Sequence, residues 1–152
     1  MIELNKKEIL EYQQNRPPYL MIDFAENIVP GKSSKGYKIF NKDEWFFEIH
    51  WKNDPNVPGM LQIEALVQMA SLSILTIEGN KGKIMYLANA NKLKFYKKIL
   101  PGSKFMIETS VISFNRGVAK FSAIGEVNNI LSCSADFTLV LPDEISKYNI
   151  KK

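Results

Sequence analysis

The sequence predicts an α+β domain in which an antiparallel sheet of about six strands wraps around one long buried helix. Residues 57–77 predict the helix, because a helix that is apolar nearly all round is normally buried. Residues 130–141 alternate apolar and polar side chains with the period of a strand. Since sheet and helix must each cover an apolar surface, packing one against the other is the economical solution.

Turn residues divide the chain into the other expected elements. Residue Arg16 ends the first helix because a residue before a proline avoids the helical region, and Pro30-Gly31 forms a hairpin turn. The 152 residues are treated as one domain with an N-terminal helix in 1–15 and a C-terminal tail in 142–152. In order, we expect a helix over 6–14, strands over 20–29 and 34–41, a helical turn over 43–47, the long helix, and strands over 83–95, 104–114, 117–127 and 130–141.

Composition excludes several classes of protein. The net charge of +4 comes mainly from lysine, with only Arg16 and Arg116 as arginines, so attraction to an acidic surface is favoured over nucleic-acid reading. The single cysteine, Cys133, excludes an internal disulfide and is expected to be buried, and one histidine provides no zinc cluster. We therefore expect no metal and no cofactor.

The location of the protein is also an expectation from sequence. The first residues lack the apolar run and cleavage site of a signal peptide, which favours a cytoplasmic protein. A membrane span over 57–77 is the competing interpretation of the apolar segment, but Gln62, Glu64 and Gln68 interrupt it. We expect no membrane span.

His50 and Glu64 are the candidate catalytic pair. His50 is the only histidine, and the Asn, Asp and Pro residues that follow place it on a loop or strand end. Glu64 follows fourteen residues later, about one and a half turns into the helix that Pro58 can open. Taken alone, a single histidine is more often an ordinary hydrogen-bonded residue, and Gln68, one turn after Glu64, could orient that carboxyl or only satisfy buried backbone.

Residues 16–141 resemble the hot-dog-fold 3-hydroxyacyl-[acyl-carrier-protein] dehydratases of the FabZ type. Three separated blocks carry the resemblance in the correct order. The strongest block is similar to the family's Phe-Phe…Gly-His-Phe-Pro-Gly…Pro-Gly-Val-Leu-x-x-Glu-Ala-x-x-Gln, with the same spacing from histidine to glutamate. The blocks are Arg16-Pro17-Pro18-Tyr19-Leu20-Met21-Ile22-Asp23, residues 44–50 with 58–68, and Lys94-Phe95-Tyr96-Lys97 with Pro101-Gly102.

The resemblance implies a hot-dog fold and removal of water from 3-hydroxyacyl thioesters held on an acyl carrier protein. Such an elimination needs a base for the α-proton, a donor for the thioester oxygen and an acid for the departing hydroxide. The resemblance assigns the role of base to His50, the role of donor to the backbone N–H of Gly59, and the role of acid to Glu64. It also implies supporting roles for Gln68 and Tyr86, and a homodimer or trimer of dimers whose sites combine residues of two protomers. The acidic carrier would dock on four lysines: Lys92, Lys94, Lys97 and Lys98.

The sequence departs from the family pattern beside the catalytic histidine. Residues Ile49-His50-Trp51-Lys52-Asn53 replace Gly-His-Phe-Pro-Gly, and Asn89 stands where glycine is usual. These departures leave substrate identity open. Two other functions also stay open: a hot-dog acyl-thioester hydrolase, which does not need this histidine, and a non-catalytic acyl-binding or assembly subunit.

Overall fold

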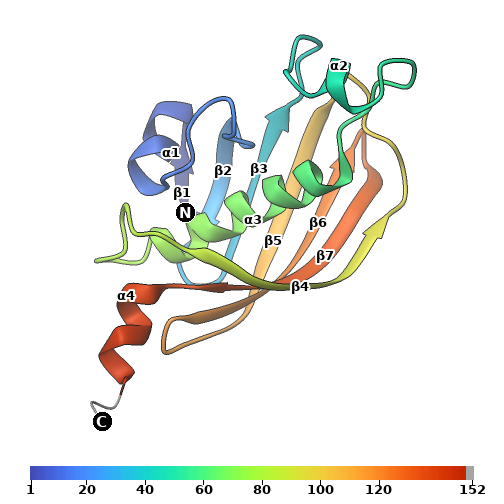
Figure 1. Ribbon diagram of the computed structural model, residues 1–152. Helices are drawn as coiled ribbons and strands as arrows, with labels where there is room; N and C mark the ends of the chain where they lie inside the picture. The colour runs from blue at the N-terminus through green and yellow to red at the C-terminus, as the bar shows by residue number, and fades with distance from the viewer. Residues whose placement is uncertain (150–152) are drawn as a thin grey trace.

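A computed structural model describes residues 1–149 and has one antiparallel sheet with a long helix across its face (Figure 1). The order of the strands is β1-β2-β3-β5-β6-β7-β4. The strands are β1 Ile2–Leu4, β2 Phe24–Val29, β3 Ser33–Ile39, β4 Tyr86–Phe95, β5 Lys104–Asn115, β6 Val118–Val127 and β7 Ile130–Val140. The helices are α1 Lys6–Tyr12, α2 Phe47–His50, α3 Gly59–Leu75, α4 Pro142–Ile145 and the 3₁₀ turn η1 Ser146–Tyr148. This arrangement confirms the predicted fold class.

Helix α3 is the buried centre of the fold. All residues from Ala65 to Leu75 are buried, and α3 packs on β2, β3, β5, β6 and β7. A Cβ at Gly36 would clash with the carbonyl oxygen of Phe24 and lie 2.8 Å from Ala25 Cα, both in the paired strand β2, and it would lie 2.6 Å from Met69 Cε of α3. A glycine is therefore required where α3 crosses β3. No helix in residues 1–149 is long and apolar enough to cross a membrane.

The sheet has seven strands, one more than the approximate number expected. The additional strand is β1, which precedes the N-terminal helix and pairs antiparallel with β2. Its three residues are too few to show a period-2 pattern, so sequence patterning does not reveal it. In the tail region, α4 and η1 cover residues 142–148, while residues 150–152 lie outside the described part of the chain.

Two strands begin later than predicted. Strand β2 begins at Phe24 because the N–H of Met21 donates to the side chain of Gln68 instead of to a neighbouring strand. Strand β4 begins at Tyr86 because Lys83 is held in a turn by a hydrogen bond to the carbonyl of Asn80. In both places the backbone hydrogen bonds are satisfied by non-sheet partners.

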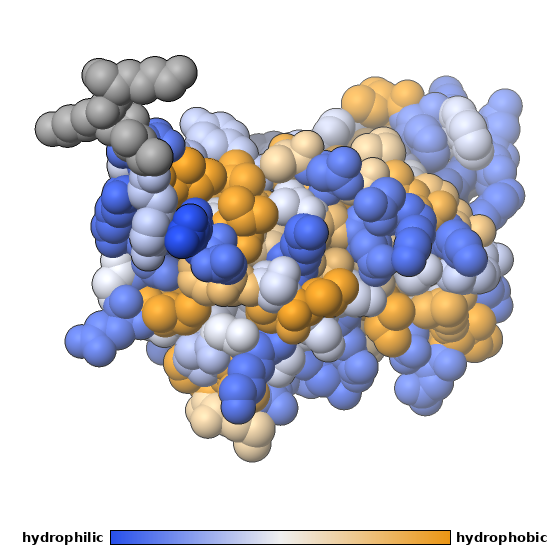
Figure 2. Space-filling view, turned by 90° about the horizontal axis from the view of Figure 1, so that it is seen from below, coloured by the Kyte–Doolittle hydropathy of each residue, from blue (hydrophilic) through white to orange (hydrophobic). Residues whose placement is uncertain are grey.

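Strand β4 is an exposed edge of the sheet. It pairs only with β7, and a bulge between Asn91 and Lys94 interrupts the register. Leu93 and Phe95 of this strand are exposed along with its lysines. Figure 2 views the molecule from the side of β4 and α4, where apolar side chains gather among polar ones.

Candidate active site

His50 is the last residue of the short helix α2. The sequence placed it on a loop or strand end, but its N–H donates to the carbonyl of Phe46 at 2.8 Å and closes a helical turn. Phe46 and Phe47 are buried, and Phe46 packs edge-on against Phe40 with ring centroids 6.0 Å apart. These aromatic anchors fix α2 on the core, so His50 has a defined position.

One ring nitrogen of His50 is committed to the backbone. Its Nδ1 lies 3.1 Å from the carbonyl oxygen of Asn56. Because a carbonyl oxygen only accepts hydrogen bonds, Nδ1 carries the proton, and neutral His50 leaves Nε2 unprotonated. The ring of Trp51 stacks on the imidazole with centroids 4.4 Å apart and planes 16° apart. The imidazole of His50 is thus held in one orientation, with Nε2 as its free nitrogen.

The amino end of α3 lies in the same pocket as His50. This pocket, of about 330 Å³, includes His50, Gly59 and Phe95 among its lining residues. Pro58 is the N-cap of α3, so the N–H of Gly59 belongs to the first turn and has no acceptor within the helix. A Cβ on Gly59 would lie 2.9 Å from Phe95 Cε1, so the aromatic ring packs directly against the glycine. An acyl oxygen in this pocket would meet a helix N-terminus.

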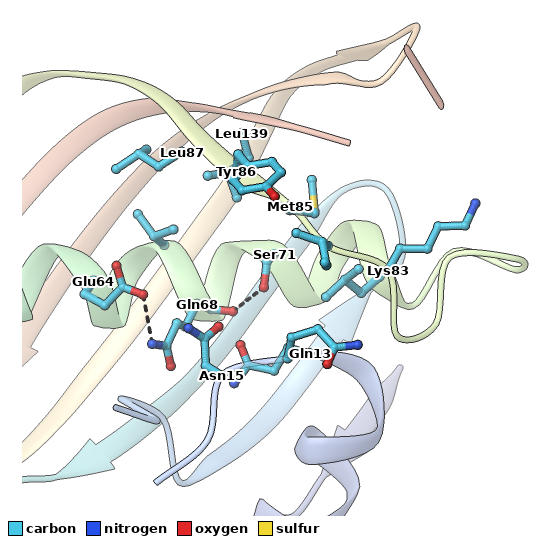
Figure 3. Close-up of a pocket in the computed structure, with 14 residues that line it drawn as sticks. Gln13, Asn15, Glu64, Gln68, Ser71, Lys83, Met85, Tyr86, Leu87 and Leu139 are labelled. Carbon is cyan, nitrogen blue, oxygen red and sulfur yellow. Dashed lines mark hydrogen bonds between the residues drawn. The ribbon is translucent and has the colours of Figure 1, made fainter. Parts of the chain in front are cut away.

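Glu64 lines a different pocket, of about 250 Å³, between α3, β4 and the segment that follows α1 (Figure 3). Its Oε1 accepts a hydrogen bond of 2.9 Å from Gln68 Nε2. The same amide of Gln68 donates to the Tyr19 carbonyl, and its oxygen accepts from the Met21 N–H. Gln68 therefore both contacts Glu64 and satisfies buried backbone, the two alternatives that the sequence had left open.

The pKa of Glu64 is raised above 4.5. Burial is the main cause, because it penalises the carboxylate, and the hydrogen bond from Gln68 opposes it in part. The pKa of the Tyr19 phenol is also raised. Burial is the larger cause, and the negative charge of Glu64 is the second. A raised pKa keeps a larger protonated fraction of Glu64 available as a proton donor.

Within one chain, the two candidate catalytic side chains lie in different pockets. His50 lines the pocket at the amino end of α3, whereas Glu64 lines the pocket beside Gln68 and Tyr86. The two pockets share no lining residue. Both border β4, through Phe95 in the first and Tyr86 in the second. A site that contains both groups would therefore have to be completed across this exposed edge.

The predicted docking lysines extend along and beyond β4. Lys97 and Lys98 line the His50 pocket, and Lys98 also forms an ion pair of 2.6 Å with Asp54. Lys92 lies 3.7 Å from Asp136. Within residues 1–149, Lys94 and Lys97 take part in no ion pair, so their charges are not neutralised by a close carboxylate. We call these four lysines the basic margin: Lys97 and Lys98 line the His50 pocket, and Lys92 and Lys94 line an adjoining pocket that shares Tyr96 with it.

Sequence reasoning missed several residues of the two pockets. Asn56 and Trp51 fix the imidazole, and neither has a local signal that would reveal a contact with His50. Gln13 and Asn15 line the Glu64 pocket, although the sequence assigned them only to the end of a helix. Cys133 is buried as predicted, and burial raises its pKa to about 12, so it is no nucleophile. In residues 1–149, no cluster of three or more His, Cys, Asp or Glu side chains is placed to hold a metal ion.

The seven-stranded sheet around a central helix defines a hot-dog-fold protein of the α+β class. Residues 14–135 match the model of the FabA-like domain. The chain belongs to the FabA-like family. Among its relatives, the 3-hydroxyacyl-[acyl-carrier-protein] dehydratase FabZ of Clostridium novyi is 36% identical over 90% of this chain and 97% of the relative. The protein of the same name from Clostridium botulinum strain Okra is 38% identical over 91% and 96%.

Solved structures share the fold at low sequence identity. The dehydratase heterocomplex ApeI:P from Xenorhabdus doucetiae aligns with a TM-score of 0.74 and 11% identity over 91% of this chain and 95% of that chain. A hypothetical thioesterase from Streptococcus pneumoniae, solved with coenzyme A, aligns with a TM-score of 0.58 and 11% identity over 77% and 83%. At these identities the likeness concerns the fold alone.

Proposed function

We propose that this protein is a dehydratase that converts 3-hydroxyacyl thioesters on an acyl carrier protein into trans-2-enoyl thioesters, in fatty acid or related acyl-chain synthesis. The observation that carries the proposal is the similarity to FabZ dehydratases along nearly the whole chain. The chemistry of His50 and Glu64 supports it. The cytoplasmic location expected from the sequence stays a prediction.

His50 is the base in this proposal. Its Nε2 takes the proton from C2 of the substrate, since Nδ1 is already bound to the Asn56 carbonyl. The proton turns the ring into an imidazolium, which the stacked Trp51 stabilises through its electron-rich face. The N–H of Gly59 donates to the thioester oxygen as negative charge develops there, and the N-terminus of α3 adds positive potential.

Glu64 is the acid. As the C2–C3 double bond forms, the C3–O bond breaks, and the hydroxide leaves as water with the proton of Glu64. The raised pKa of Glu64 supports this role, since an exposed carboxyl would be almost fully ionised at neutral pH. Gln68 orients the carboxyl through its hydrogen bond to Oε1. The site is reset when His50 releases a proton and Glu64 takes one up.

We infer that each working site combines His50 of one protomer with Glu64 of another. The separate pockets of the two side chains support this arrangement, as does the exposed edge that borders both. Phe95 is 50% exposed and Tyr86 is 58% exposed on this strand. An edge with unpaired backbone groups and exposed aromatic side chains favours pairing with a second copy. Whether dimers associate further, as a trimer of dimers, is a second expectation to be measured.

One assay distinguishes this function from its rivals. The purified protein is incubated with a trans-2-enoyl thioester on acyl carrier protein, and both the acyl product and free thiol are measured. Reversible hydration to the 3-hydroxyacyl thioester is the expected result. Release of free thiol would instead identify an acyl-thioester hydrolase, and binding without any reaction would identify a non-catalytic acyl-binding subunit.

The basic margin beside the His50 pocket is expected to act only on carrier-bound substrates. Replacing both Lys94 and Lys97 with glutamate should slow the reaction with acyl carrier protein about tenfold and weaken its dependence on salt, because the lysines attract an acidic partner. Reaction with a small pantetheine thioester should be unchanged. The control is Lys7→Glu with Lys42→Glu, which makes the same change of charge at two exposed lysines that line no pocket with the docking lysines. An equal loss on both substrates would contradict docking and indicate a damaged strand.

A further inference from the structure

The pocket that holds Glu64 is unusually polar for one that would receive an acyl chain. Along α3, Glu64, Gln68 and Ser71 face it at intervals of four and three residues, as Figure 3 shows. A hydrocarbon tail in this pocket would cover these groups without offering any of them a hydrogen bond. Such burial costs free energy for each group left without a partner. Half of the lining is polar: Gln13, Gln14, Asn15, Glu64, Gln68, Ser71 and Lys83.

Gln13 is the member of this lining that lacks a partner. Its side chain is 3% exposed, and neither its Oε1 nor its Nε2 has a hydrogen-bond partner within residues 1–149. Its neighbour Gln14, by contrast, donates to the carbonyl of Gly82 at 2.8 Å. The terminal amide torsion of glutamine is broad and roughly two-fold, so rotation about it can exchange the positions of the Gln13 donor and acceptor. A buried amide of this kind destabilises the folded protein unless a polar group forms a hydrogen bond with it.

The groups lie at a suitable distance from the reacting carbons. Ser71 follows Glu64 by seven residues, which corresponds to about 10 Å along the helix axis. Its hydroxyl donates to the Gln68 carbonyl at 2.7 Å, so its oxygen remains free to accept. Lys83 lies at the end of the pocket remote from Glu64 (Figure 3). A tail that begins near Glu64 would therefore reach the Ser71 hydroxyl oxygen, the Gln13 amide and then the Lys83 ammonium group.

We propose that this pocket selects acyl groups whose distal end carries a hydrogen-bonding oxygen function, with Gln13 as a specificity-determining residue. The proposal rests on the dehydratase function proposed above and adds the class of substrate. A terminal hydroxyl would be recognised by the Gln13 amide and the Ser71 oxygen. A terminal carboxylate would also be attracted by Lys83. The hydroxyl and the carboxylate are both oxygen groups that can form hydrogen bonds, and the experiment below distinguishes them.

The test compares pantetheine thioesters of matched length that end in a methyl, a hydroxyl or a carboxylate group. A chain of about ten carbons is suitable, because the polar groups lie about 10 Å beyond Glu64. We expect the wild-type protein to dehydrate the better polar-tailed substrate with kcat/KM about tenfold above that of the methyl-ended one. Gln13→Leu should abolish this preference while still dehydrating the methyl-ended substrate.

Two further variants and a melting curve separate recognition from structure. Gln13→Leu should melt at or above the wild-type temperature, because it removes two unpartnered buried atoms. Lys83→Met should lower kcat/KM for the carboxylate tail only, and Lys81→Met, at an exposed lysine outside this pocket, is the matched control. Equal rates on all three tails, or a polar preference that survives in Gln13→Leu, would overturn the inference while leaving the dehydratase function intact. Failure to dehydrate any tail would instead refute the proposed function and this inference with it.

Discussion

Replacing His50 with alanine is expected to abolish enoyl-thioester hydration. The imidazole is the only group proposed to take the C2 proton, and positioned acid–base groups contribute about 10²–10⁴-fold to rate. The thermal midpoint should change little, because the ring is half-buried at the end of α2 and its removal leaves Phe46 and Phe47 in the core. Both quantities are measured on the same preparation, by absorbance of the enoyl thioester and by thermal unfolding.

Asn56→Ala is not a control for this variant, since that residue's backbone carbonyl, not its side chain, holds His50. A better matched control is Trp51→Phe, which keeps an aromatic ring against the imidazole. It should retain most of the activity. Residual activity above about a tenth of the wild-type level in His50→Ala would reject His50 as the base.

Replacing Glu64 with glutamine is expected to lower turnover more than substrate binding. The substitution keeps the shape and the hydrogen bond to Gln68 but removes the acidic proton, so the interaction is lost mainly in the transition state. Turnover should fall by about 10²-fold or more with KM nearly constant. Unchanged turnover accompanied by weakened assembly would make Glu64 a structural residue.

The same variant has a stability signature that depends on pH. Burial raises the pKa of folded Glu64 above its unfolded value, so between these two pKa values the folded protein holds a proton that the unfolded chain has released. The contribution of Glu64 to stability is therefore fully present below the unfolded pKa and is lost as pH rises through the folded pKa. Glu64→Gln should melt higher than the wild type at pH 7 and nearly equal to it at pH 4. A melting difference that does not change with pH would contradict a perturbed Glu64.

Elements with a long pattern were predictable from sequence. The apolar run of α3 and the alternation of β7 can be recognised in the sequence because each continues over many residues. The three-residue strand β1 has no period to show. His50 was assigned to a loop since proline and asparagine follow it, yet a hydrogen bond to Phe46 and buried aromatic rings extend helix α2 to it. Tertiary packing decided that boundary.

Sequence predicts the candidate site as a set of residues but not as a geometry. The family resemblance assigned His50 and Glu64 to the site, and the helical repeat placed Gln68 one turn beyond Glu64. Sequence does not show that the two side chains line separate pockets of one chain, since that depends on how β4 runs past α3, with Phe95 in the His50 pocket and Tyr86 in the Glu64 pocket. The unpartnered amide of Gln13 likewise becomes visible only when α1 is docked beside the helix.

The measurement that tests the account most directly is complementation between two inactive variants. His50→Ala and Glu64→Gln chains are mixed under conditions of subunit exchange, and enoyl-thioester hydration is followed while a mass-tagged chain confirms that exchange occurs. In a statistical mixture about half the dimers contain one chain of each kind, and each of these has one intact site, so activity should recover to about a quarter of the wild-type sites. No recovery after confirmed exchange would contradict a site built from His50 of one protomer and Glu64 of its partner.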